Sequence, residues 1–389
     1  MARPLRVEFA GAGQKLARIF ANLSRVQSVT PLANLRIFVA PLMLVLSALP
    51  VTAKEFANIE YLCADWGPAM TLPSKPGEKP HFDDSQEEVY FLKQLGTFSR
   101  GLMGTGEHHG INIYLCKMKP DGSGKTEIRE LWRNPNYSID TQDKSTWMNV
   151  CVKTHQIALT VTFAGSDITG LWTMNLDGSD LKRIITPAYV NGGLQSVGSP
   201  GWTPDGQWIV FGESVRGAGR NGRIAKCDAH GERRSYLTDS PMDGQPRVSP
   251  DGKQVAFIRW IIKGDVHDSW LWLVGLDGSN SRPLPNPDAR PNWSAQAHWG
   301  LNPAWSPDGK EILLTDNIID VASGKVRLER RPMLQGKQGT YGWPHWGKSG
   351  FVGSCVGGIL LTDLELREAK WIGSSKLVEC SGPKESCRW

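Results

Sequence analysis

Polar side chains that could bind a ligand or a metal recur at regular intervals in this sequence. Each stands at or shortly before one member of a series of aromatic or β-branched residues; they are His81, Asn149, Ser199, Gln245, Asn302 and His345. Imidazoles that converge on one point can hold a divalent metal. The same polar groups could instead form a solvated wall or contact an organic ligand. The choice depends on the elements that position them.

A sequence repeat defines those elements. Three segments, 201–211, 247–257 and 304–314, are near copies in which Ser/Thr-Pro-Asp-Gly is followed by an apolar run, and weaker copies occur at 81–91, 149–159 and 345–352. The six copies are anchored at Phe82, Val150, Trp202, Val248, Trp305 and Trp346, between 41 and 68 residues apart. This spacing is typical of four-stranded β-sheet blades.

Each copy encodes two hairpins. Proline fixes φ early in the Ser/Thr-Pro-Asp-Gly turn, and glycine takes the left-handed conformation that lets the flanking strands pair. A second apolar strand follows and ends in Asp-Gly-Ser, as at 171–179 and 271–279. A sheet with two apolar faces cannot bury them alone, whereas six sheets stacked in a ring can. The sequence therefore predicts an all-β, six-bladed β-propeller over residues 80–373, with four antiparallel strands in each blade.

The repeat resembles a known family. Pro303-Ala-Trp-Ser-Pro-Asp-Gly-Lys-Glu-Ile312, and the strand Met174-Asn-Leu-Asp-Gly-Ser179, look like the TolB-type, or Trp-Asp-like, β-propeller repeat of exported bacterial proteins. TolB proteins carry an α/β domain before the propeller, and only 27 residues separate Ala53 from His81 here. We expect residues 54–79 to form an extension that includes a candidate closing strand, and residues 374–389 to form a tail.

The start of the chain is typical of a signal segment. The net charge of +5 is contributed by residues 1–53, which contain six basic residues and one acidic residue. The remaining residues balance to zero, which gives no electrostatic reason to expect nucleic-acid binding. An apolar run from Ile37 to Leu49 precedes Val51-Thr-Ala53, which predicts cleavage after Ala53 and a periplasmic or secreted protein. The alternative is an uncleaved leader that anchors the protein in the membrane.

Seven cysteines follow this segment. Cys380 and Cys387 bracket a short Gly-Pro loop and are the best candidates for a disulfide. Cys116 and Cys227 occupy matching places in two repeats, where a strand needs a small buried residue. No Cys-x-x-Cys pair indicates zinc or redox chemistry.

The first strand of each blade in propellers of this family lines a central channel, so the predicted site lies at the channel mouth. It comprises His81, Asn149, Asp243, Gln245, Trp293, Trp299, Asn302, Tyr341 and Trp343. The expected function is a scaffold without catalytic activity or cofactor, which binds an envelope protein, a peptide or a glycan. No Gly-x-Ser-x-Gly motif supports a hydrolase.

A second hypothesis rests on resemblance. Some oligogalacturonide lyases are similar to this repeat family and hold a metal ion at the channel mouth through His and Gln side chains. Gln296, His298 and His345 could play those parts with a divalent metal ion as cofactor.

Overall fold

The structure is a computed structural model. The chain divides into two units, Met1–Ala53 and Lys54–Trp389. The structure describes residues 54–100, 106–133, 144–163, 166–190, 193–215, 222–263, 266–285, 302–314, 317–330, 333–334, 337–338, 342–355 and 358–379. The predicted signal segment, its cleavage site and the Cys380–Cys387 disulfide therefore lie outside the described residues.

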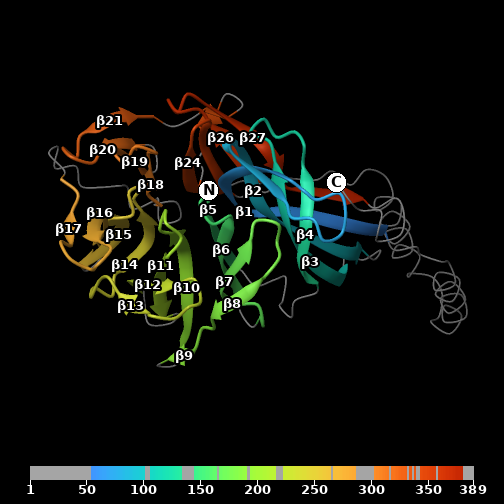
Figure 1. Cartoon of the computed structure of the whole chain (residues 1–389), viewed down its shortest axis with the longest axis horizontal. Helices are drawn as coiled ribbons and strands as arrows, with labels where there is room; N and C mark the ends of the chain where they lie inside the picture. The colour runs from blue at the N-terminus through green and yellow to red at the C-terminus, as the bar shows by residue number, and fades with distance from the viewer. Residues whose placement is uncertain are drawn as a thin grey trace, which may run out of the picture. The chain divides into compact units, whose positions relative to one another are not determined.

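All regular secondary structure in these ranges is β-strand, arranged as six sheets that we number as blades in chain order. Blade 1 contains β1 (Lys54–Thr71), β2 (His81–Arg100), β3 (Gly106–Met118), β4 (Thr126–Arg133) and, from the far end of the chain, β28 (Lys376–Glu379). Blade 2 contains β5 (Lys144–Cys151), β6 (Gln156–Phe163), β7 (Gly170–Asn175) and β8 (Lys182–Ile185). Figure 1 shows the sheets succeeding one another around a common centre.

The other four blades repeat this plan. Blade 3 contains β9 (Tyr189–Val190), β10 (Gly193–Trp202), β11 (Trp208–Val215), β12 (Gly222–Asp228) and β13 (Ser235–Tyr236). Blade 4 contains β14 (Asp243–Val248), β15 (Gln254–Lys263), β16 (Val266–Gly275) and β17 (Arg282–Pro283). Blade 5 contains β18 (Ala304–Trp305), β19 (Glu311–Leu314), β20 (Asn317–Asp320) and β21 (Val326–Glu329).

Blade 6 contains β24 (Gly342–Gly347), β25 (Gly350–Cys355), β26 (Gly358–Thr362) and β27 (Glu368–Ser374). Two short strands, β22 (Met333–Leu334) and β23 (Lys337–Gln338), extend this sheet, and β22 pairs in parallel with β27. Each blade thus has a core of four antiparallel strands, and blades 1, 3 and 6 carry short additional strands. The predicted six-bladed propeller is confirmed.

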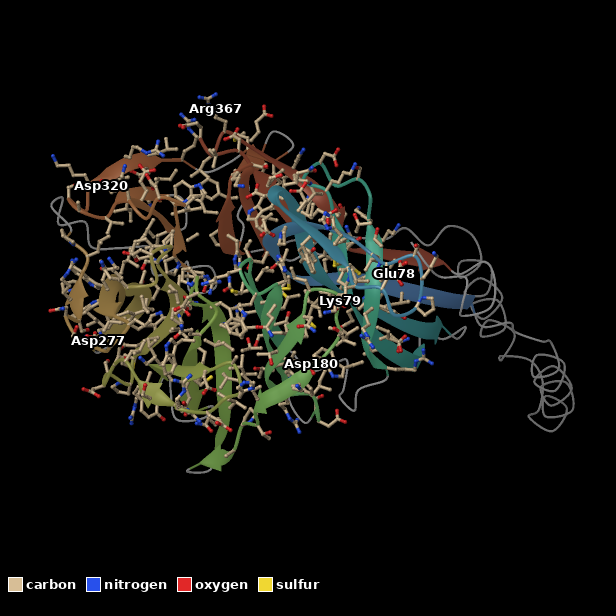
Figure 2. All side chains as sticks on the ribbon, viewed as in Figure 1. Glu78, Lys79, Asp180, Asp277, Asp320 and Arg367 are labelled. Atoms are coloured by element: carbon tan, nitrogen blue, oxygen red, sulfur yellow. The ribbon has the colours of Figure 1, made fainter. Side chains whose placement is uncertain are left out.

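The ring is held together by apolar contacts between neighbouring blades. On β11, Ile209 and Phe211 pack toward blade 2, whereas Val210, on the opposite face, packs toward blade 4. The described residues form six such clusters, one between each pair of successive blades, and the last of them joins blade 6 to blade 1. Charged side chains such as Asp180, Asp277 and Arg367 project from the outer turns (Figure 2).

The Ser/Thr-Pro-Asp-Gly turns join the first and second strands of blades 3, 4 and 5. In blade 4 the Ser249 hydroxyl donates to Asp251 Oδ1 at 2.6 Å, and the Gly252 N–H donates to the Ser249 carbonyl at 2.9 Å. Gly252 has a φ of +72°, which a residue with a Cβ rarely adopts. The pKa of Asp251 is lowered chiefly by the hydrogen bond from Ser249. These turns behave as the sequence predicts.

Blade 1 begins earlier than the sequence prediction placed it. Residues 54–71 lie in the segment predicted as an extension with a candidate closing strand; they form β1, which pairs with β2 from Lys54↔Arg100 to Thr71↔His81 and so belongs to blade 1. The prediction took 81–91 as the first hairpin because the tight turn is replaced in blade 1 by the longer segment 72–80. The expected tail also contributes a strand, since β28 pairs with β1 at residues 56–59.

Candidate functional site

One residue from each blade lies immediately before the anchor of the innermost strand. Blade 1 contributes Asp65, because its anchor is Trp66 on β1 rather than Phe82 on β2. The set, in blade order, is Asp65, Asn149, Gly201, Arg247, Ala304 and His345. All six line one cavity of about 410 Å³. We call this cavity the mouth cavity, because it opens at the end of the ring where the Pro-Asp-Gly turns lie.

Bulges in the innermost strands position these side chains. The strand register shifts between Gly198 and Gly201 in β10, between Gly244 and Arg247 in β14, and between Gly342 and His345 in β24. Two bulge residues, Ser199 and Gln245, have positive φ of 49° and 56°. A residue with a side chain persists in that conformation only where its surroundings hold it. The bulges are therefore fixed features of the channel wall.

Asp65 is buried and accepts four hydrogen bonds. The N–H groups of Trp66 and Val150 each donate to its carboxylate at 2.8 Å, and Asn149 Nδ2 donates at 2.9 Å. His345 Nδ1 lies 2.6 Å from Asp65 Oδ1. An ionised carboxylate is an acceptor only, so this arrangement suits a charged Asp65. The residue joins blade 1 to blades 2 and 6.

His345 links Asp65 to an arginine across the channel. Arg247 Nη2, on blade 4, lies 3.4 Å from His345 Nε2, on blade 6. Because Arg247 can only donate, Nε2 is the acceptor, and Nδ1 carries the proton that is donated to Asp65. The neighbours thus assign one neutral tautomer to His345.

Arg247 is buried, yet only part of its guanidinium is bonded. Its exposed fraction is 6%, and Nη1 donates to the Pro246 carbonyl at 3.1 Å. Its Nε has no partner within the described part of the chain. Burial lowers the pKa of Arg247 to about 10, and the nearby Asp65 carboxylate opposes that shift. The side chain therefore remains a cation at neutral pH.

Aromatic and proline side chains form much of the cavity wall. Trp66, Trp202, Trp305 and Trp346 line it, together with the turn prolines Pro204, Pro250 and Pro307. The indole N–H of Trp305 donates to the Arg247 carbonyl at 3.0 Å, and that of Trp66 donates to the His345 carbonyl at 3.1 Å. Two exposed cations, Lys153 and Lys348, stand at the rim. The wall of the mouth cavity is thus largely apolar, and the cavity contains one buried cation, Arg247.

The residues predicted for the site divide into three groups. Asn149 and His345 line the mouth cavity. Asn302, which is fully buried, accepts from the Ser199 hydroxyl at 3.4 Å, and Gln245 is half-buried with Oε1 unpaired among the described residues. Trp293, Gln296, His298, Trp299, Tyr341 and the side chain of Trp343 lie outside the described residues.

Two predictions for individual residues differ from the structure. His81 is exposed at the start of β2, because the inner strand of blade 1 is β1. Asp243 is buried at the opposite end of β14 from Arg247, where it forms a bidentate ion pair with Arg259 at 2.6 and 2.8 Å. Neither side chain lines the mouth cavity.

Sequence reasoning missed Asp65 and Arg247. Arg247 directly precedes the Val248 anchor in one of the three near copies of the repeat, so a residue-by-residue alignment of the copies identifies it. Asp65 could not be aligned that way, because blade 1 lacks the Ser/Thr-Pro-Asp-Gly turn.

The described cavity residues do not fit a metal centre. Both ring nitrogens of His345 are engaged, one by Asp65 and the other by Arg247. A divalent ion at Nε2 would have to displace a guanidinium cation. Among the described residues no group of three His, Cys, Asp or Glu side chains is placed to hold a metal.

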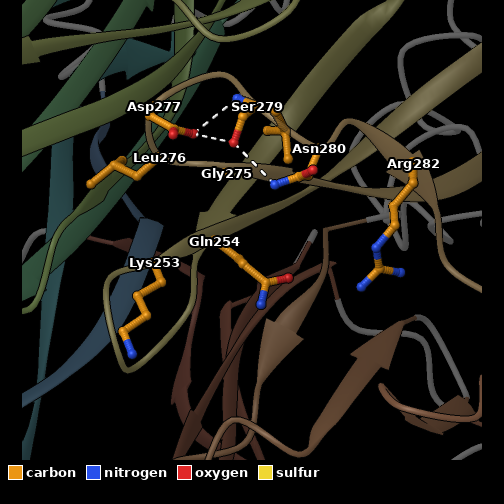
Figure 3. A pocket seen from close by; sticks show the side chains of 9 residues that line it. Lys253, Gln254, Gly275, Leu276, Asp277, Ser279, Asn280 and Arg282 are labelled. Atoms are coloured by element: carbon orange, nitrogen blue, oxygen red, sulfur yellow. Dashed lines mark hydrogen bonds between the residues drawn. The ribbon is translucent and has the colours of Figure 1, made fainter.

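A second hollow, of about 500 Å³, lies on the outer part of blade 4. Its polar groups largely bond to one another: the Ser279 N–H and hydroxyl donate to Asp277 at 2.9 and 2.7 Å, and Asn280 Nδ2 donates to Ser279 at 3.1 Å. Lys253 and Arg282 lie at opposite sides of the hollow (Figure 3). This is the pattern of an Asp-Gly-Ser turn with exposed charges around it.

Comparison with known proteins supports the assignment of the repeat. No protein-family model matches the chain. An uncharacterized protein of Agrobacterium fabrum is 28% identical over 160 residues, which are 39% of this chain and 49% of that protein. The Tol-Pal system protein TolB of Rhizorhabdus wittichii is 35% identical over 91 residues, which are 23% of this chain and 18% of TolB. The chain thus spans about half or less of the length of these relatives.

Among solved structures, oligogalacturonate lyase from Vibrio parahaemolyticus aligns over 84% of this chain and 100% of its own, with 9% identity and a TM-score of 0.39.

These observations define a class of protein: an all-β, six-bladed propeller. Over 91 residues its sequence is similar to that of TolB. The described residues contain no helix long and apolar enough to cross a bilayer.

Proposed function

We propose that this protein is an exported binding propeller that takes a peptide segment of an envelope partner into the mouth cavity and catalyses no reaction. The observation that carries the proposal is the mouth cavity itself, which is lined by all six blades. A volume of about 410 Å³ suits a few residues of an extended chain and lies within the range of ordinary ligand sites.

The chemistry of the lining favours binding over catalysis. A general base needs a free lone pair aimed at the substrate, and the lone pair of His345 Nε2 faces Arg247. The hydroxyls of Thr203 and Ser249 donate to the aspartates of their own turns. His345 is therefore not placed to activate either hydroxyl as a nucleophile.

The lining also favours a peptide over a glycan. A sugar presents many hydroxyls, each of which needs a partner once it leaves water. Asn149 already donates to Asp65 at 2.9 Å and accepts from the Trp202 N–H at 2.7 Å, and Asp65 is saturated. Tryptophan and proline walls suit apolar side chains instead.

Export is part of the proposal. The predicted cleavage site after Ala53 directly precedes Lys54, where β1 begins. Removal of residues 1–53 would therefore leave every strand of the described propeller intact. A periplasmic or secreted location follows from this leader.

Site-specific photo-crosslinking tests the proposal. A photoreactive phenylalanine analogue at Val152, 44% exposed on the cavity rim, is compared with one at Tyr236, 47% exposed on the outermost strand of blade 3. We expect irradiated cells to yield one recurrent envelope-protein adduct from position 152 and none from position 236. Equal adduct patterns from the two positions, or none from 152, would contradict the proposal.

A further inference from the structure

We propose that Arg247 forms an anion subsite that receives the C-terminal carboxylate of the bound peptide, with an apolar last residue packed against the tryptophan and proline walls. This inference rests on the proposed function and specifies the ligand of the same cavity. It assigns a role to the N–H groups of the Arg247 guanidinium that have no partner among the described residues.

The donors of Arg247 are available to a ligand. A guanidinium has five N–H groups, and the described contacts of Arg247 use one for the Pro246 carbonyl and one for His345 Nε2. None of the ion pairs among the described residues includes Arg247, and the Asp65 carboxylate is hydrogen-bonded to His345 instead. A buried cation with unbonded N–H groups is costly unless an anion completes it.

The remaining acids near the cavity are engaged elsewhere. Asp65 holds four donors. Glu87, at the rim, accepts from the N–H groups of Lys348 and Ser349 at 2.8 and 3.1 Å. A carboxylate brought by a ligand would therefore meet Arg247 without competition from these two side chains, and planar carboxylates match the guanidinium fork.

Contacts across the ring favour a chain end over an internal segment. Arg247 on blade 4 reaches His345 on blade 6, and Ser199 on blade 3 reaches Asn302 on blade 5. A peptide that threaded through the ring would have to break these two contacts, whereas a chain end held in the mouth cavity would not. A C-terminus presents its charge at the tip and needs only one strand to enter, whereas an internal loop must bring two.

The walls specify the last side chain. Trp202, Trp305 and Pro250 offer apolar surface around the cation, and the hydroxyls and amides between them are already bonded within the protein. Burial of an apolar side chain is favourable at such a surface, whereas burial of a polar one is not. The expected ligand is a peptide that ends in an apolar residue with a free carboxylate.

The test uses the purified propeller, residues 54–389, and three arrays of heptapeptides of matched sequence. The first array has free C-terminal carboxylates, the second has C-terminal amides, and the third has C-terminal amides with one internal glutamate. We expect binding on the first array, enriched in apolar last residues, and a loss of about 10- to 100-fold on the amide versions, as for a charge-assisted hydrogen-bonded contact.

Each other outcome overturns the inference. Equal binding of acids and amides removes the role of the carboxylate. Equal binding of the glutamate array assigns the anion to a side chain rather than to the terminus. Absence of binding on the acid array excludes the ligand class. If the crosslink at Val152 persists under any of these outcomes, the proposed function stands and only the carboxylate subsite fails.

Variants of two arginines on blade 4 provide the matched control. Arg247→Gln removes the cation from the mouth cavity, and Arg282→Gln makes the same change at the exposed outer hollow. Fluorescence anisotropy with the best acid peptide should show a loss of 10-fold or more for Arg247→Gln and no change for Arg282→Gln. Circular dichroism reports folding of both variants. If Arg247→Gln does not fold, the acid and amide comparison on the unaltered protein decides the matter alone.

Discussion

Two of the arginines in blade 4, Arg247 and Arg259, have opposite environments. Arg259 pairs with the buried Asp243 through two hydrogen bonds, and its guanidinium lies 4.0 Å from the centre of the Trp272 ring. Arg247, at the other end of β14, is more deeply buried but meets a neutral histidine and a carbonyl. A fully paired charge serves the fold, whereas a partly paired one at a cavity is available to a ligand.

The largest effect should follow from breaking the complete pair. Arg259→Met leaves Asp243 buried without its cation, so the free energy of unfolding should fall by about 3–5 kcal/mol, as when one partner of a buried ion pair is removed. Guanidinium unfolding followed by tryptophan fluorescence measures this loss. Removing both charges in Asp243→Leu/Arg259→Met should restore most of it. A loss below about 1 kcal/mol in the single variant would show that the pair is not structural.

An intermediate effect is expected at Asp65. Asp65→Asn replaces an ionised acceptor of four donors by an amide, and the free energy of unfolding should fall by about 2 kcal/mol. The same change removes a negative charge beside Arg247, so the affinity for the acid peptide should rise. Asp239→Asn, an exposed position just before blade 4, serves as the control and should change stability by less than about 0.5 kcal/mol. Weaker peptide binding in the Asp65 variant would argue against an anion subsite.

A smaller effect on stability is expected at Arg247. Arg247→Met leaves no carboxylate unpaired, because Asp65 keeps its own hydrogen-bond donors. The free energy of unfolding should therefore change by no more than about 1 kcal/mol in either direction. The same denaturation experiment checks this value beside Arg259→Met. A loss as large as that of Arg259→Met would mean that both arginines are structural.

The smallest effect should come from divalent metal. His345 has no free ring nitrogen in the described arrangement, so addition of a metal ion or of a chelator should leave the melting temperature unchanged. Elemental analysis of the purified protein supplies the direct measurement. One metal ion per chain, lost in His345→Ala, would instead support a metal-dependent lyase.

The fold could be predicted wherever the repeat keeps its turn. Blades 3, 4 and 5 contain Ser/Thr-Pro-Asp-Gly, whose preferences are local and therefore visible in sequence. Blade 1 could not be placed, because segment 72–80 replaces that turn and pairing of β1 with β2 depends on contacts across it. Local signals alone do not reveal such pairing.

Only part of the candidate site could be predicted from the sequence, for a related reason. Asn149 and His345 were found because they directly precede their anchors. Gln245 was predicted for the site, but a bulge in β14 places Arg247 in the cavity instead. The environment of Arg259 was also hidden, since only the register of β14 with β15 sets Asp243 opposite it.

The cluster that seals blade 6 against blade 1 has a consequence for biosynthesis. Ile59 and Phe91 pack there against Val352, Ile359 and Ile372, so the chain must leave the ribosome as far as Ile372 before this interface is complete. Until then the apolar face that blade 1 contributes to this cluster remains exposed to solvent. Exposed apolar surface of this kind makes a partly synthesised chain prone to aggregation, so the incomplete propeller is a candidate substrate for chaperones.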